Sequence, residues 1–149
     1  MVKNARYARQ RNGRTRAGST ARVDRLRSEL GGISRKLHTI IPHISFSEGF
    51  APKSVIEEID ELIELGMLHL AEQKISKLRN RFAAELIHFF KISIETAPIA
   101  RRDRGRVIEI YDKARRLGPG NRQFNTCVAA GDAYALAITQ PLTRRRRAV

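Results

Sequence analysis

The sequence predicts an all-α protein, a four- to five-helix bundle with a basic N-terminal arm and an Arg-rich C-terminal tail. Apolar residues recur every three or four positions through most of the chain, and no stretch shows the alternation of a strand. The 149 residues are 42% apolar, enough for one modest core. We therefore expect a single helical domain over residues 19–140, with the arm at 1–18 and the tail at 141–149.

The longest run with helical periodicity, residues 54–97, should organise this domain. One helical stripe collects its apolar residues and should face the core: Val55, Ile59, Leu62, Ala71, Ile75, Leu78, Phe82, Leu86 and Phe89. Ser54 and Glu57 have the spacing of a capping box, which predicts a helix start at Ser54, and Pro98 prevents continuation. Gly66 leaves two interpretations open. It ends one helix of an antiparallel hairpin, or it lies within one long helix at a cost of about 1 kcal/mol.

A second apolar seam runs through residues 19–41, where a helix should begin after a Ser19 or Thr20 cap. Its members alternate at spacings of three and four: Val23, Leu26, Leu30, Ile33, Leu37 and Ile40. The opposite side of this helix should be a basic face that approaches a phosphate backbone: Arg22, Arg25, Ser28, Gly32, Arg35 and Lys36. The alternative is that the glycine pair at 31–32 breaks the helix and that these arginines are solvated surface.

The charge distribution predicts a polyanionic partner. The net charge of +14 divides into +9 over residues 1–37, −3 over 38–96 and +8 over 97–149. The arm contributes six basic residues with no acid before Asp24: Lys3, Arg6, Arg9, Arg11, Arg14 and Arg16. Arginine matches phosphate oxygens, and the single aromatic residue of the arm argues against base stacking. We expect sequence-independent contacts to a nucleic-acid backbone. A mitochondrial presequence is the other interpretation of such an arm, but apolar residues are few.

The connection between the two predicted apolar segments has two interpretations. Residues 38–52 form an apolar connection that either contacts another subunit or packs back over its own helices.

The C-terminal helices are expected over 103–139, with Asp103 as a cap and a final helix ending at Thr139. Before and within them is a second cationic cluster that folding could place beside the first: Arg101, Arg102, Arg104 and Arg106. The last helix presents small residues suited to close packing between subunits: Ala129, Ala133 and Ala137.

Catalytic signals are weak, so we expect no enzyme, no metal and no cofactor. The chain has one Glu-x-x-His pair, Glu85 with His88, whereas a di-iron bundle supplies two. Phosphate loops, nucleophile elbows and ligand-spaced cysteines are absent from the sequence, and Cys127 should be a buried thiol. No apolar run resembles a membrane span or a secretory signal, so we expect an intracellular rather than a secreted protein.

The arrangement of arm, basic-faced helix, apolar bundle and small-residue final helix resembles the coat proteins of filamentous and rod-shaped archaeal viruses. The resemblance covers the whole chain as architecture and includes no defining motif. It implies a virion protein that wraps double-stranded DNA in a helical filament, alone or with a related coat subunit, with membrane contact only if the virion is enveloped. The four-arginine tail departs from that pattern. RNA remains an open partner, and a cellular nucleoid- or ribosome-associated protein is the alternative function.

Overall fold

The computed structural model describes the backbone of residues 2–140 and the side chains of residues 20–140. The predicted all-α class is confirmed, because the described part of the chain is mainly helical and contains no strand. Five helices and two short 3-10 turns follow one another: α1 (Val2–His38), η1 (Ile41–His43), α2 (Pro52–Glu64), α3 (Leu68–Ser93), η2 (Ile94–Thr96), α4 (Arg101–Arg116) and α5 (Asn121–Thr139). The tail at 141–149 lies outside the described residues.

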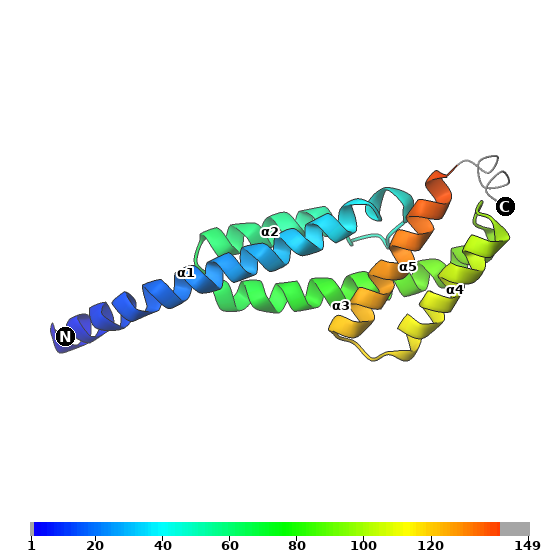
Figure 1. Cartoon of the computed structure of the whole chain (residues 1–149). Coiled ribbons are helices and arrows are strands. Elements are labelled where there is room, and N and C mark those ends of the chain that lie inside the picture. The colour runs from blue at the N-terminus through cyan, green and yellow to red at the C-terminus, as the bar shows by residue number, and fades with distance from the viewer. Residues whose placement is uncertain (1, 141–149) are drawn as a thin grey trace.

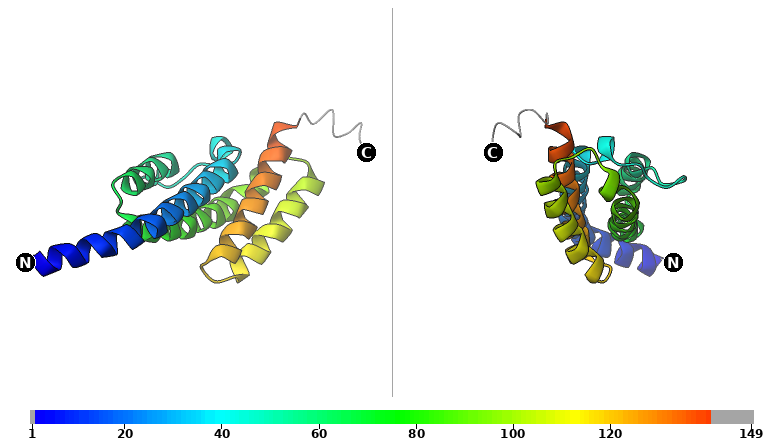
Figure 2. Two further views of the ribbon diagram at one scale, coloured as in Figure 1. Left: turned by 60° about the vertical axis from the view of Figure 1, so that its left-hand side comes forward. Right: turned by 90° about the vertical axis from the view of Figure 1, so that its right-hand side faces the viewer.

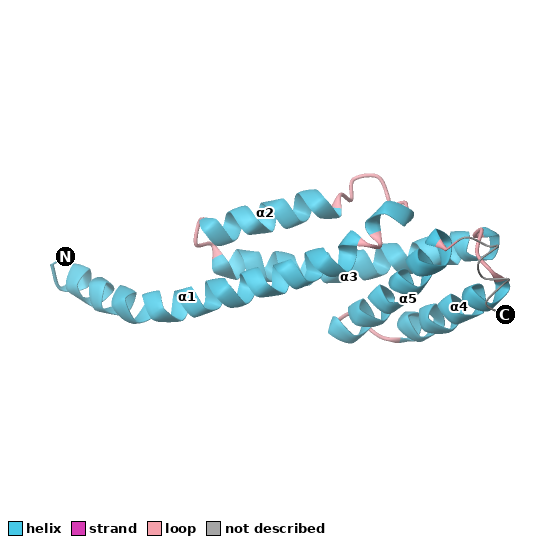
Figure 3. Cartoon of the chain, turned by 45° about the horizontal axis from the view of Figure 1, so that its top comes forward, coloured by secondary structure: helices cyan, strands magenta, loops and turns pink. Residues whose placement is uncertain are grey.

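The helices form two packed groups that meet along the C-terminal half of α3 (Figure 1). Helices α1, α2 and α3 lie along the long direction of the molecule, and α4 and α5 form a hairpin at the end opposite the N-terminus (Figure 2). The N-terminal part of α1 extends beyond the turn between α2 and α3 (Figure 3). The molecule is therefore elongated, with the start of α1 at one end and the α4–α5 hairpin at the other.

Helix α1 is longer than the sequence predicted. It begins at Val2, so the expected start at Ser19 or Thr20 is wrong, and it continues through the glycine pair to His38. The predicted seam is confirmed as a core face, with every member except the half-buried Val23 at 5% exposure or less: Leu26, Leu30, Ile33, Leu37 and Ile40. This packing against α2 and α3 holds the helix through two glycines that local propensity disfavours.

The central segment is an antiparallel hairpin, which decides between the two interpretations of Gly66. Its φ of 76° lies in the left-handed region that glycine adopts without strain. The predicted capping box is wrong, because α2 begins two residues earlier at Pro52 and its N-cap, Ala51, makes no side-chain hydrogen bond. Proline suits the first helical turn, where its fixed φ fits and no amide hydrogen is needed. The predicted stripe is buried or packed against the core throughout.

The connection between α1 and α2 packs back over its own helices rather than remaining exposed. Ile44 is buried, and the Phe46 ring lies 5.6 Å from that of Phe82. The buried Glu85 carboxylate accepts hydrogen bonds from the Ser47 amide at 3.0 Å and hydroxyl at 2.8 Å, and pairs with Arg81 at 3.1 Å. Burial acts to raise the pKa of Glu85, but these partners outweigh it and hold the pKa below its usual value.

The C-terminal hairpin packs closely against the rest of the chain. Helix α4 begins at Arg101 with Ala100 as N-cap, so the expected cap at Asp103 is wrong, whereas α5 ends at Thr139 as predicted. Gly131 lets α5 approach the end of α1, since a Cβ there would lie 2.9 Å from Ile40 Cδ1. The Cys127 thiol is buried as expected, and burial raises its pKa to about 12.

Candidate nucleic-acid interface

The predicted basic arm forms the N-terminal half of α1. Its six basic residues belong to the part of the helix that projects past the α2–α3 turn (Figure 3). At about 1.5 Å of rise per residue, Lys3 to Arg16 cover about 20 Å of helix axis. Their side chains lie outside the described residues, so what the fold contributes to this part of the site is the spacing and direction of its backbone.

Two arginines of the predicted basic face are paired within the chain. Arg22 binds the Glu72 carboxylate of α3 with two hydrogen bonds, from Nε to Oε1 at 3.1 Å and from Nη2 to Oε2 at 2.8 Å. The Nη2 atom of Arg25 donates to the same carboxylate at 2.8 Å. The hydrogen bonds of Arg22 lower the pKa of Glu72, helped by the charge of both arginines, and Glu72 raises the pKa of Arg22. Glu72 therefore offsets part of the positive charge on this face.

The remaining predicted positions on this helix divide between solvent and the N-terminus of α5. Arg35 is exposed. Ser28, Gly32 and Lys36 line a small cavity of about 240 Å³ beside Asn121 and Asn125. The Lys36 ammonium donates to Asn125 Oδ1 at 3.4 Å. The face is thus interrupted by this cavity, which its small residues line together with the start of α5.

Arg27 is a surface cation that the sequence prediction omitted. It is exposed on α1 and makes no ion pair within the described residues. The prediction started from one helical face, opposite the seam, and Arg27 lies outside it. Its signal in the sequence was the charge alone, in a segment with only two acids before residue 38.

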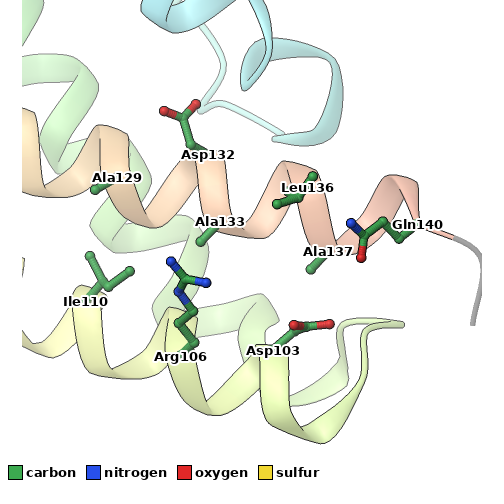
Figure 4. Close-up of a pocket in the computed structure, with 9 residues that line it drawn as sticks. All are labelled: Asp103, Arg106, Ile110, Ala129, Asp132, Ala133, Leu136, Ala137 and Gln140. Atoms are coloured by element: carbon green, nitrogen blue, oxygen red, sulfur yellow. The ribbon is translucent and has the colours of Figure 1, made fainter. Parts of the chain in front are cut away.

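The second predicted cationic cluster, at residues 101–106, also contains both exposed arginines and one that binds within its own chain. Arg101 and Arg102 are exposed at the start of α4. Arg104 is half-buried, and its Nη2 donates to the Ala97 carbonyl at 2.8 Å, which ties down the connection from α3. Arg106 points toward α5 from the edge of an α4–α5 groove (Figure 4). Helix α4 lies at the end away from the projecting arm, so a single chain does not bring the two clusters together (Figure 1).

The small residues predicted for subunit packing lie along the same groove. Ala137 is buried, Ala133 is half-buried and Ala129 is exposed. Figure 4 shows these side chains on the side of α5 that faces α4. The groove has a volume of about 370 Å³, and Ile110 and Leu136 complete its apolar lining. The small-residue stripe therefore serves the hairpin of its own chain and leaves an open groove beside it.

Other kinds of site have little support in the part of the chain that the structure describes. No group of three His, Cys, Asp or Glu residues could hold a metal ion there, and Glu85 of the Glu-x-x-His pair is engaged by Ser47 and Arg81. No helix among residues 2–140 is long and apolar enough to cross a membrane. Comparison with known proteins finds no matching family model, no matching curated protein and no matching solved structure.

Proposed function

We propose that this chain is a structural nucleic-acid-packaging protein, which binds phosphates without sequence preference and self-assembles into a helical nucleoprotein filament, as a viral coat protein does. Double-stranded DNA is the favoured partner. In this proposal the projecting half of α1 lies along the nucleic-acid backbone, and the bundle provides the contacts between subunits. The proposal places the protein in a virion and assigns it no catalytic activity.

One observation supports the binding half of this proposal above the others. The first 23 residues carry seven basic and no acidic side chains, on a helix whose start projects beyond the bundle. A duplex carries about one negative charge per 1.7 Å of axis, so a cationic helix laid against it displaces several counterions at once. The arm has almost no apolar residues for a core, and a polyanion is the partner that its chemistry fits.

Electron microscopy of the purified full-length protein, with and without double-stranded DNA, tests the proposal most directly. Regular filaments whose length follows the length of the added DNA are the expected result. Discrete particles of a few subunits per DNA would instead favour a cellular nucleoid-associated protein. A protein that neither binds duplex nor forms particles would contradict both functions.

A salt titration tests the chemistry of binding separately from assembly. With about six phosphate contacts from the arm, the logarithm of affinity for a short labelled duplex should fall with the logarithm of salt concentration at a slope of about −5 or steeper. Equal affinities for duplexes of unrelated sequence are also expected. A flat salt response would contradict phosphate binding, and a single-stranded RNA of equal length is the comparison that tests the preference for DNA.

A further inference from the structure

Apart from the basic arm, which projects past the α2–α3 turn, the helices at the two ends of the bundle carry opposite charge. Helix α2, next to the α2–α3 turn, has one basic and five acidic residues, for a net charge of −4. Helix α4, in the hairpin at the other end, has seven basic and three acidic residues, for a net charge of +4. Of the carboxylates on α2, only Glu58 forms an ion pair within the described residues, with Lys74. Most of this acidic surface therefore has no cationic partner among residues 20–140.

The same two ends also carry the exposed apolar side chains. Among the described residues, five large hydrophobic side chains are exposed, and three of them lie at the α2–α3 turn: Leu65 at 72%, Met67 at 47% and Leu70 at 36%. A fourth, Leu136 at 60%, lines the groove between α4 and α5. The fifth is Ile92, which lines no cavity described for the chain. Apolar exposure thus coincides with the charged ends.

The groove offers an apolar surface to the turn, beside a helix of positive net charge. Its volume of about 370 Å³ is large beside the roughly 30 Å³ that one water molecule occupies. Ile110 and Ala133 are part of its apolar lining, the exposed Leu136 lines its outer side, and Arg106 lies at its edge (Figure 4). Asp103 and Asp132 also line it, so the positive charge that would face the acidic turn comes from the rest of α4, whose net charge is +4.

We infer that the α2–α3 turn of one copy of this chain docks into the α4–α5 groove of the next copy. Leu65 and Met67 would enter the groove, and the carboxylates of α2 would face the arginines of α4. Because the two surfaces differ and lie at opposite ends of an elongated molecule, the contact is heterologous and repeats without closing, which produces a filament. The inference deepens the assembly half of the proposed function, and it does not depend on nucleic-acid binding.

Two single substitutions, one at each surface, test the contact. Leu65→Asp places a charge on the turn, and Leu136→Asp places one in the groove; both side chains are solvent-exposed in the single chain, so the fold should survive. Each variant alone should be monomeric by analytical ultracentrifugation at concentrations where the parent assembles in low salt. Ile92→Asp is the matched control, since it introduces the same charge at a similarly exposed site and should assemble as the parent does.

Mixing the two variants gives the sharpest result. Leu65→Asp retains an intact groove and Leu136→Asp an intact turn, so an equal mixture should form dimers of twice the 16.9 kDa chain mass and stop there. A symmetric turn-to-turn contact instead predicts that Leu136→Asp, whose turn is intact, dimerises on its own, without Leu65→Asp. A mixture that stays monomeric, a parent that is monomeric at every concentration, or a control that fails to assemble would overturn the inference.

Duplex binding by the same proteins separates this inference from the proposed function. Leu65→Asp should bind a short duplex with the parent's affinity, because the turn lies outside the proposed phosphate-binding residues. If the parent binds no duplex but the mixed variants dimerise, the proposed function fails and the contact stands. If duplex binding is normal but no mixture dimerises, the contact fails alone. Circular dichroism of each variant verifies the fold.

Discussion

Residues 2–18 and residues 20–38 belong to one helix, but different forces hold the two halves in it. The second half buries Leu26, Leu30, Ile33 and Leu37 against α2 and α3, so tertiary packing stabilises it. The first half projects past the bundle and has few apolar residues. Helix propagation from an existing helical segment costs less free energy than nucleation, so the packed half supports the projecting one. The second half of α1 thus contributes core packing, and the first half contributes positive charge.

The two halves of α1 also differ in how far their basic residues are paired within the chain. In the packed half, Arg22 and Arg25 share Glu72 of α3, and Lys36 contacts Asn125 of α5. The projecting half has no acidic residue in its sequence. We therefore expect nucleic-acid affinity to depend mainly on the first half and folding stability on the second. The predictions below test that division, beginning with the largest expected effect.

Removal of residues 1–18 should abolish most nucleic-acid binding and leave the bundle folded. At low salt the affinity for a short duplex should fall by about a hundredfold or more, and the salt slope should become shallower by about 5, because six phosphate contacts are lost. Fluorescence anisotropy measures the affinity, and thermal unfolding followed by circular dichroism should give an unchanged midpoint. A full-length variant with the six basic residues of the arm changed to Gln controls for helix length. If it binds like the parent, the arm is not the binding segment.

Leu30→Ala tests the other half of the comparison. Leu30 is 5% exposed in the seam, so its truncation should lower the free energy of unfolding by about 2–5 kcal/mol. Chemical denaturation with urea measures the loss. Duplex affinity per folded molecule should stay near that of the parent, since no cation is removed. Ile92→Ala, at a site 64% exposed, should change stability by less than about 0.5 kcal/mol. A loss of similar size at both sites would mean that the seam has no special role.

Gly131→Ala tests how the end of α1 is fixed against α5. The added Cβ would lie 2.9 Å from Ile40 Cδ1 and 3.1 Å from Cγ2, so overpacking should cost about 1–3 kcal/mol of unfolding free energy. Adding Ile40→Val removes the nearest of these atoms and should recover part of the loss. Gly105→Ala on α4 meets no atom within 4 Å and should instead stabilise the protein, by up to about 1 kcal/mol. Equal effects at both glycines would contradict a close contact.

Periodicity predicted the fold well, because burial along a helix leaves a pattern in the sequence. The seam of α1 and the stripe of α2 and α3 follow from apolar spacing, and the end of α5 at Thr139 follows from Pro141, which cannot continue a helix. The starts of α1, α2 and α4 were predicted poorly. Ser54 and Asp103 have good capping chemistry, but Pro52 and Arg101 begin their helices earlier, without a side-chain cap. The chain can begin a helix wherever packing supports it, and local cap signals do not encode that support.

The candidate site was less predictable than the fold, because ion pairs join residues that are distant in sequence. Glu72 lies 50 positions from Arg22, and nothing in the spacing of either residue indicates that they meet. Arg104 similarly appeared to belong to a surface cluster, whereas it binds the Ala97 carbonyl. Counting charges predicted that the ends are basic. It could not predict which of those charges the fold itself would neutralise.

Glu72→Gln is expected to have the smallest effect, and it tests whether the packed half can be made to resemble the projecting one. The amide has no negative charge, so Arg22 and Arg25 would become available to a phosphate backbone. We expect duplex affinity to rise a few-fold and the salt slope to steepen by about 1–2. Glu58→Gln removes an equal charge from α2, where Glu58 pairs with Lys74, and controls for net charge alone. Equal gains in the two variants would mean that this face lies away from the nucleic acid.

The pH dependence of stability gives an independent measurement on the same variant. Because the folded state holds the pKa of Glu72 below its usual value, the carboxylate stabilises the fold above the ordinary glutamate pKa of about 4.3. That contribution is lost as the pH falls through the lowered pKa. The parent should therefore be more stable than Glu72→Gln at pH 7, and their urea denaturation curves should converge on acidification. A stability difference that persists in acid would show that the amide disturbs packing, and any gain in duplex affinity could then not be assigned to the freed arginines.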